Sequence, residues 1–548
     1  MNFSNKLSPK RIFSLFAAAV MTFSATACTE NFENTDFPVA DNFDNYLPNK
    51  EEVQLRVLTD KSQNEVNLTV WSWQVPSAEY AEKYAEEAKK LGFDGIDFVV
   101  QWKKFEAVQG EFDWKYLDSI LDVFVKHDLG ISISVLFWTE GLEWRDELDF
   151  QMTSDGKIYA YDDMRSHFLA LNSEKNIAVM ENTLKYFAAH CDGKYKENIT
   201  RWYIRTSVYA EMEYSSLVDL DYSPSAISAF KKFLQEKYAA CAVFNKHYGY
   251  SVESWEELAN MDGVELAKTC LYDWKLFKQK TIIDISNMYT KIFKIANPDI
   301  PVSLQLSSIW DTSASFYRGV FDPYVIATES KVDIIQISDS PVWPHDFSID
   351  LLASFTSGQY IAMETDGSWR GESAFDDYVK QVSDSVSSGA SYINAVNWEY
   401  EDLLLYGEKY LSQYKSSADS AKNRSIHDVT DVILINTRDF LLRTPPQDMH
   451  DLYYYAYRNM SSWGSKKVRF ITDTQILADP TILNSITKIH VGELADVIVM
   501  SDEVGKLLAE SSITLVDDLN AQPNFINEYG EPLQEEVQVA LRAKLKDS

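Results

Sequence analysis

The chain has 548 residues, of which 45% are hydrophobic and 14% aromatic, so it can bury the core of one large domain and of a smaller one. Its formal net charge is −32 at pH 7. That charge excludes nucleic acid as an expected partner, because a basic footprint is needed to neutralise phosphates. An acidic chain rich in aromatic residues suits neutral ligands such as sugars.

The first 27 residues predict a targeting segment. Lys6, Lys10 and Arg11 precede an apolar run over 12–23, and small residues follow up to Cys28. This order resembles a bacterial lipoprotein signal, in which Cys28 is lipidated; a secretory signal cut after Ala27 is the alternative. Lipidation predicts a lipid-anchored protein of the cell envelope, on the outer membrane and either periplasmic or surface-exposed. Residues 28–64 are polar and acidic and predict a tether.

From residue 65 to 420, short apolar runs alternate with amphipathic stretches. We expect strands at 68–71, 95–100, 131–137, 202–208, 302–306, 332–337, 359–363 and 392–396. Helices are expected at 77–91, 113–125, 174–189, 224–238, 270–295, 349–355, 375–386 and 408–414. Eight such units predict an α/β fold, a (β/α)8 TIM barrel with insertions after its third and fourth strands. An open doubly wound sheet is the alternative, which the lack of a Gly-rich phosphate turn disfavours.

The expected strands end in groups that could form one site, because chemistry in a parallel barrel sits at the carboxyl ends of its strands. The seventh run stops on Glu364, and the fourth leads into Glu211 and Glu213. Flat aromatic rings pack on pyranose faces while carboxylates handle hydroxyls and the glycosidic oxygen, so an aromatic-walled cup with a few acids predicts a sugar site. The candidate substrate contacts at the other strand ends are Trp73, Trp102, Trp138, Asp339 and Trp398.

The cysteines give no sign of a metal site. Apart from Cys28, only Cys191, Cys241 and Cys270 are present, widely spaced and without a C-x-x-C pair. This spacing predicts no zinc site, no metal and no cofactor, and it disfavours a disulfide framework.

The segment over 92–138 resembles the opening of the glycoside hydrolase clan of 4/7 (β/α)8 barrels, and most of all the family 42 β-galactosidases. The resemblance rests on a W-x-x-x-E-x-x-x-G-x-F-x-x-x-x-L-D pattern made by Trp102, Phe105, Glu106, Gly110, Phe112, Leu117 and Asp118. A second segment, over 226–255, is similar to the F-x-x-W-L-x-x-K-Y…L-N-x-x-W-G-T stretch of that family, through Phe230, Leu234, Lys237, Tyr238, Asn245 and Gly249.

The resemblance implies a retaining glycosidase that acts on an oligo- or polysaccharide, with Glu364 as nucleophile and Glu211 as general acid/base. Glu213, two residues on, competes with Glu211 for the second role. The sequence departs from the clan where Ala210 stands in place of the usual Asn, and where Ser338 and Asp339 stand in place of a Tyr on the sixth strand. Two alternatives stay open: an inverting α-glucan hydrolase similar to β-amylases, suggested by the A-E-M-E-Y segment, and a catalytically inactive glycan-binding lipoprotein.

A second, smaller domain is expected over 428–515, with strands near 429–435, 468–471, 489–490 and 497–500. It resembles a shortened form of the flavodoxin-like domain that follows the barrel in family 42, where that domain supports oligomers, so a homo-oligomer is left open. Residues 516–548 are expected to form an acidic C-terminal tail that ends in a short helix.

Overall fold

The computed structural model describes residues 65–160, 167–309, 311, 317–339, 344–356, 358–366, 372–420, 429–443, 448–461, 466–493, 495–517 and 522–547. In these ranges eight parallel strands pair in sequence order and close into a barrel, so the predicted fold class is confirmed. The open-sheet alternative is wrong, because β1 pairs with β8. The strands are β1 (Glu65–Trp71), β2 (Gly95–Gln101), β3 (Gly130–Leu136), β4 (Ile199–Ile204), β5 (Val302–Leu306), β6 (Ile334–Asp339), β7 (Tyr360–Asp366) and β8 (Tyr392–Val396).

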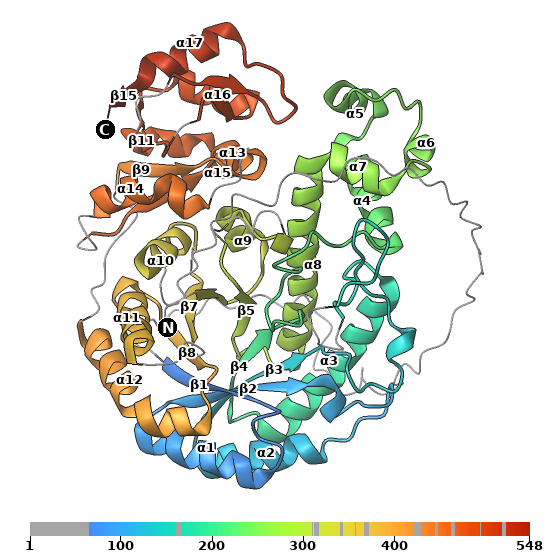
Figure 1. Cartoon of the computed structure of the whole chain (residues 1–548), viewed down its shortest axis with the longest axis vertical. Helices are drawn as coiled ribbons and strands as arrows, with labels where there is room; N and C mark the ends of the chain where they lie inside the picture. Colours follow the sequence, from blue (N-terminus) through green and yellow to red (C-terminus); the bar gives the residue numbers. More distant parts are fainter. Residues whose placement is uncertain are drawn as a thin grey trace, which may run out of the picture. The chain divides into compact units, whose positions relative to one another are not determined.

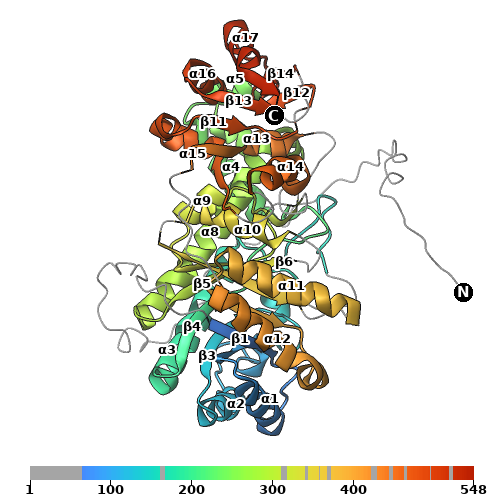
Figure 2. The same ribbon diagram turned by 90° about the vertical axis from the view of Figure 1, so that its left-hand side faces the viewer.

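Helices surround the barrel strands (Figure 1). They are α1 (Ala78–Leu91), α2 (Lys115–Lys126), α3 (Glu174–Tyr195), α8 (Leu271–Ala296), α9 (Pro323–Glu329), α10 (His345–Ala353), α11 (Glu372–Ser388) and α12 (Tyr400–Ser420). The helices α11 and α12 lie side by side on the outside of the strands, as Figure 2 also shows. The insertion after β4 adds α4 (Pro224–Tyr238), α5 (Cys241–Tyr248), α6 (Trp255–Ala259) and α7 (Gly263–Thr269). None of the helices in the described ranges is long and apolar enough to cross a membrane.

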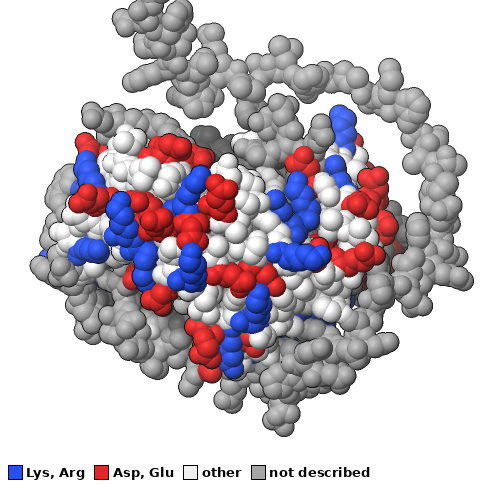
Figure 3. Space-filling view, turned by 90° about the horizontal axis from the view of Figure 1, so that it is seen from below, with Lys and Arg blue, Asp and Glu red and all other residues white. Residues whose placement is uncertain are grey.

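The amphipathic pattern of these helices explains how they attach to the barrel. In α2, Leu117, Ile120, Leu121 and Phe124 recur at helical spacing, and all four are fully buried. Burying such side chains contributes roughly 1.5–3 kcal/mol each. The opposite faces of α1 and α2 are charged, with ion pairs such as Lys89–Asp128 at 3.0 Å. Figure 3, which looks at the face formed by these helices, shows basic and acidic side chains interspersed rather than gathered by sign.

The inside of the barrel is polar. Asn394 of β8 donates a hydrogen bond to the Tyr203 hydroxyl of β4 at 2.7 Å and another to Asp97 of β2 at 3.1 Å. Because these strands are not neighbours in the sheet, the bonds pass through the barrel lumen. Arg205 adds an ion pair with Asp97 at 2.7 Å, in which both side chains are buried. Barrels of this type commonly fill this space with branched apolar side chains, so the polar lumen is a particular feature of this chain.

The second domain is built on a parallel sheet with the strand order β10-β9-β11-β13-β15. Numbered within the domain this is 2-1-3-4-5, the order of flavodoxin-like folds, which confirms the predicted type of domain. A further pair, β12 and β14, stands apart. The elements are β9 (Asp431–Ile435), α13 (Thr437–Leu442), α14 (Met449–Ser461), β10 (Arg469–Thr472), α15 (Asp473–Ala478), β11 (Lys488–His490), β12 (Val497–Val499), α16 (Asp502–Glu510), β13 (Thr514–Asp517), β14 (Asn524–Ile526), α17 (Glu535–Lys544) and β15 (Leu545–Asp547).

The predicted boundary of this domain at residue 515 is wrong. Strand β13 crosses it, and β15, the last strand, pairs with β13 through Leu515 and Leu545. The expected tail therefore supplies an edge strand of the sheet. Leu533 and Leu541 are buried in the core of the domain, which gives this acidic stretch its reason to fold.

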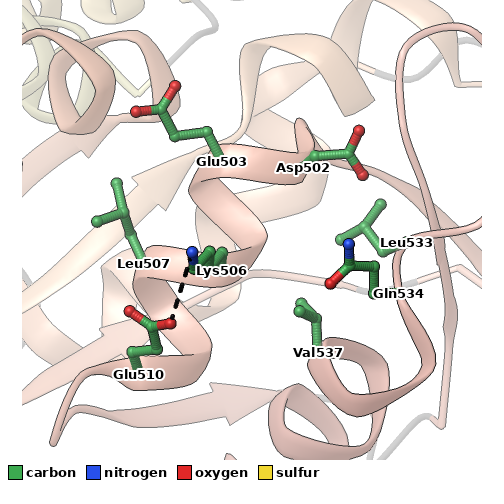
Figure 4. A pocket seen from close by; sticks show the side chains of 8 residues that line it. All are labelled: Asp502, Glu503, Lys506, Leu507, Glu510, Leu533, Gln534 and Val537. Carbon is green, nitrogen blue, oxygen red and sulfur yellow. Dashed lines mark ion pairs between the residues drawn. The ribbon is translucent and has the colours of Figure 1, made fainter.

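A hollow of about 530 Å³ lies between α16 and α17 (Figure 4). Its lining includes Asp502, Glu503 and an ion pair between Lys506 and Glu510 at 4.0 Å. It has no aromatic wall, so it lacks the features expected of a sugar site.

Candidate active site

Glu364 lies near the carboxyl end of β7, as predicted, and only 6% of its surface is exposed. It is in register with Ser338 of β6 on one side and with Asn394 of β8 on the other. Gln305 of β5 donates a hydrogen bond from Nε2 to its Oε2. Arg205, a buried cation beyond the end of β4, is also close enough for the charge of Glu364 to act on it. The carboxylate is thus held on the barrel axis side of β7 between a donor and a cation.

The fourth strand ends earlier than predicted, at Ile204. The chain then leaves the sheet and returns. The Trp202 amide donates to Pro301 O at 2.9 Å, the pairing continues to Ile204 and Leu304, and beyond the end of β4 the Met212 amide donates to Gln305 O at 2.7 Å. These bonds are four residues apart along β5 but ten apart along the other chain, so six residues are extruded. We call residues 206–211 the β4 loop.

The β4 loop closes on itself and carries Glu211 at its end. The amides of Thr206 and Ser207 both donate to the carbonyl oxygen of Glu211, at 3.3 and 2.8 Å. Ala210, just before Glu211, has a positive φ of 75°, and it packs in a small apolar cluster with Trp71 and Trp138. Such a φ is uncommon for a residue with a Cβ, so packing and the closing bonds together hold this turn. The loop thereby returns Glu211 to the end of the barrel.

Glu211 is half-buried, and the surroundings of its carboxyl group favour the protonated form. Burial, followed by the charges of Glu213 and Glu364, raises the pKa of Glu211 well above its usual value. Its Oε2 is buried and has no hydrogen-bond partner among the described residues. Glu211 and Glu364 are therefore two interacting carboxyl groups in different surroundings, one poised to hold a proton and the other hydrogen-bonded by an amide donor.

Glu213, the competing candidate, forms an ion pair with Arg318, whose charge acts on Glu211 less than burial and the neighbouring acids do. Arg318 approaches its Oε1 at 3.6 Å, and the same guanidinium also approaches Asp311 at 3.4 Å. Burial raises the pKa of Glu213, while Arg318 opposes the rise. Only 2% of its surface is exposed. An acid held against a cation is suited to a structural ion pair, so Glu211 is the better candidate for proton transfer.

Two of the predicted tryptophans lie together at this end of the barrel. Trp73 is 43% exposed and stacks between Trp71, at a centroid distance of 4.7 Å, and Trp138, at 5.2 Å. The Trp138 indole also donates a hydrogen bond to Val208 O in the β4 loop at 2.9 Å. These aromatic rings therefore form a stack that is joined to the loop that carries Glu211.

Two other predicted contacts are contradicted by their burial. Trp102 is fully buried and donates to Glu106 at 2.7 Å, and Trp398 is 2% exposed and donates to the Tyr378 hydroxyl of α11 at 2.7 Å. Neither ring offers a face to a sugar; both are core residues. Asp339 ends β6 in register with Thr365, and its side chain lies outside the described residues, as does Cys28.

The sequence reasoning missed the glutamines beside Glu364. Gln305 and Gln336 are in register on β5 and β6, and both are fully buried. A signal was present: each is the one amide side chain in its short strand and is flanked on both sides by Leu or Ile. Likewise Arg201 and Tyr203 in β4, and Arg205 just beyond its end, alternate with Trp202 and Ile204, a period-two pattern that puts them on the lumen side. Among the described residues no group of three or more His, Cys, Asp and Glu side chains could hold a metal ion.

Comparison with known families decides the relationship. The family profile of glycoside hydrolase family 42, described as beta-galactosidase, matches residues 157–434, just over half of the chain. This chain belongs to glycoside hydrolase family 42. The matched span runs from before β4 to the start of the second domain and includes both Glu211 and Glu364.

Individual members of family 42 are distant from this chain. The beta-galactosidase BgaB of Geobacillus sp. (strain Y412MC61) is 23% identical over 309 residues, which cover 52% of this chain and 42% of that protein. The aligned part thus spans less than half the length of this relative. The beta-galactosidase of Rahnella sp. R3 has a similar fold, with a TM-score of 0.66 at 12% identity, over 89% of this chain and 76% of that one.

The fold of this family 42 chain is also similar to that of a protein with another name. The catalytic domain of a beta-amylase from Paenibacillus polymyxa superposes with a TM-score of 0.51 at 15% identity, over 66% of this chain and 99% of that domain. At such identities the similarity shows a shared barrel and nothing about chemistry.

Proposed function

We propose that this protein is a β-galactosidase-like glycoside hydrolase that cleaves its substrate with retention, using Glu364 as nucleophile and Glu211 as general acid/base. The observation that carries the proposal is the half-buried Glu211, whose carboxyl group has one buried oxygen without a described partner and is influenced by the charge of Glu364. Pairs of carboxyl groups with separated proton affinities are the working parts of glycosidases. Membership of family 42 and the names of the relatives support the same chemistry.

The reaction follows from these two environments. A Glu364 oxygen attacks the anomeric carbon as the bond from that carbon to the leaving oxygen breaks, and Glu211 gives its proton to that oxygen. In the second step water attacks the anomeric carbon and gives a proton to Glu211, and the bond to Glu364 breaks. Two inversions restore the original configuration, and Glu211 regains its proton. No metal is needed for this acetal chemistry.

The substrate is held beside the aromatic stack in this proposal. Both ring faces of Trp73 are covered by Trp71 and Trp138, so an apolar sugar face is proposed to pack against Trp138 and the exposed edge of Trp73, at the barrel end that carries Glu211. Asp339, at the end of the strand next to Glu364, is proposed to bind sugar hydroxyls. Trp102 and Trp398 are left out because they are buried.

The roles of the glutamates are tested by three substitutions. Glu364→Ala should abolish turnover while circular dichroism stays native. Glu211→Ala should lower the rate of hydrolysis of alkyl β-galactosides by about 10²–10⁴-fold. It should leave the glycosylation step with a dinitrophenyl β-galactoside almost unchanged, because that leaving group departs without a proton. Added azide should then restore turnover and yield a β-galactosyl azide. Glu213→Ala is the matched control and should show no azide rescue; rescue in that variant would transfer the acid/base role to Glu213.

Product stereochemistry and a substrate screen distinguish the proposed function from the two alternatives, an inverting α-glucan hydrolase and a glycan-binding protein. The first-formed anomer, followed by proton NMR, should be β; an α product from a β-galactoside would mean inversion. If an α-glucan rather than a β-galactoside is turned over, the β-amylase-like alternative replaces the proposal. If a full screen of aryl glycosides shows no release and isothermal titration shows glycan binding, the chain is a binding protein.

We also propose that the mature chain begins at a lipidated Cys28 and is anchored in the cell envelope. Support comes from the basic, apolar and small residues that precede Cys28 in order. Metabolic labelling with a fatty-acid analogue should label the wild type and not Cys28→Ala. Equal labelling of both, or of neither, would contradict lipidation.

A further inference from the structure

A continuous row of hydrogen bonds leads to Glu364 through the barrel lumen. Gln305 Nε2 donates to Glu364, Gln336 Nε2 donates to Gln305 Oε1, and the Tyr203 hydroxyl donates to Gln336 Oε1 at 2.7 Å. The Tyr203 oxygen in turn accepts from Asn394 Nδ2 at 2.7 Å and from the Arg201 guanidinium at 3.0 Å. The two glutamines and Asn394 are fully buried, and Tyr203 and Arg201 are 1% exposed, so water does not compete for these groups.

The chemistry of the donors fixes the direction of this row. A guanidinium can only donate, so the Tyr203 oxygen accepts from Arg201 and its single hydrogen is left for Gln336. The Gln336 amide must then turn its oxygen toward Tyr203 and its nitrogen toward Gln305. The same rule turns the Gln305 nitrogen toward Glu364. A cation at one end of the row therefore determines that a donor, and not a carbonyl oxygen, meets the carboxylate at the other end.

We propose that Gln305 is a positioning residue that keeps Glu364 ionised and correctly oriented, and that Gln336 sets which end of the Gln305 amide faces the carboxylate. This inference rests on the proposed role of Glu364 as nucleophile. A hydrogen bond to the charged form of an acid favours that form, and an ionised partner makes the bond roughly twice as strong as a neutral one. The other charged groups described around Glu364 are Arg205 and Glu211. Arg205 also favours the ionised form of Glu364, and Glu211 does not oppose that form as long as its own carboxyl group keeps its proton.

The test measures kcat/KM against pH with a dinitrophenyl β-galactoside. With this leaving group, glycosylation does not need the Glu211 proton, so the acidic limb reports ionisation of the nucleophile. Gln305→Met is close in size and donates nothing. It should move the acidic limb upward by about one to two pH units and lower the rate on the plateau. Gln381→Met, at a buried glutamine of α11, is the matched control and should leave the limb where it is.

The direction of the row has its own test at position 336. Gln336→Met removes the donor to Gln305 and should move the acidic limb by less than Gln305→Met. Gln336→Glu places an ionised acceptor next to Gln305, whose amide then turns its nitrogen away from Glu364 and its oxygen toward it. This variant should move the limb further than Gln336→Met. If Gln305→Met does not fold, the two variants at position 336 carry the test.

The outcomes separate this inference from the proposed function. A fluorinated β-galactosyl inactivator, followed by peptide mass spectrometry, should label Glu364 in the wild type; a label elsewhere overturns the nucleophile assignment and this inference with it. If Glu364 is labelled but Gln305→Met shifts the acidic limb no more than Gln381→Met does, the positioning role is refuted while the proposed function stands. Equal shifts in the two variants at position 336 refute the directional part.

Discussion

The hydrogen bond between Trp138 and the β4 loop gives a prediction that isolates the position of Glu211. The substitution Trp138→Phe keeps an aromatic ring in the stack with Trp73 but removes the indole N–H that meets Val208 O at 2.9 Å. Val208 is 4% exposed, so water replaces this donor poorly. An unsatisfied buried carbonyl costs about 1–3 kcal/mol, which amounts to a factor of about 5 to 150 in the population of the closed loop.

The loss should depend on the leaving group, because the loop carries Glu211, the proposed proton donor, and not Glu364, the proposed nucleophile. We expect kcat/KM for methyl β-galactoside to fall by about 5- to 150-fold. By contrast, kcat/KM for a dinitrophenyl β-galactoside should change by less than about threefold, because this leaving group departs without needing the proton of Glu211. Trp144→Phe is the control: Trp144 is 6% exposed, and its indole nitrogen has no partner among the described residues. Equal losses on both substrates would refute the idea that Trp138 acts through Glu211.

Three further predictions follow from buried charges and from the chemistry. Burial raises the pKa of Asp350 in α10 to about 7, so its folded form binds a proton more readily than the unfolded chain, and stability should fall as the pH rises from about 4 through 7. Asp350→Asn keeps an acceptor for Tyr457 and should raise the melting temperature at pH 8 but not at pH 4, as calorimetry can check. Asp97→Asn leaves Arg205 buried without its counter-charge and should cost about 3–5 kcal/mol in urea unfolding, a loss that added Arg205→Met should partly restore. Dialysis against a chelator should leave turnover unchanged; a loss that one added divalent ion restores would contradict the two-carboxylate chemistry.

The barrel could be predicted from the sequence because each strand is a short apolar run followed by an amphipathic helix. The position of Glu364 followed from the same rule, since a buried run that stops on an acid points to a strand end. The end of β4 could not be found in this way. Residues such as Val208 continue the apolar character of Trp202 and Ile204, and only the hydrogen bond from Met212 to Gln305 O shows that the chain has left the sheet and returned.

The direction of side chains beyond the strand ends is a second feature that could not be predicted from the sequence. The sequence predicts Trp398 in the cup because it closely follows the eighth apolar run, which ends at Val396. Instead Asn397 has a φ of 61°, which turns the chain and directs the indole toward Tyr378. Trp102 likewise starts a short helical turn rather than extending β2. A residue that follows a strand keeps the strand's alternation only if its backbone stays extended, and local sequence does not determine that.

The β4 loop changes how relatives of this chain can be recognised. The ladder resumes at Met212 as though the six extruded residues were absent, so the count of residues from Trp202 to the glutamates carries no information about where the glutamates lie in the barrel. A search that counts along the chain from Trp202 without the six extruded residues would arrive at Arg205 instead of Glu211 and report the site as lost. A search by hydrogen-bonded position on β5 would instead arrive at the Glu211–Met212–Glu213 segment. In this chain, the position of the proposed acid/base residue is therefore defined by its hydrogen-bonded register with β5 and not by its distance along the chain.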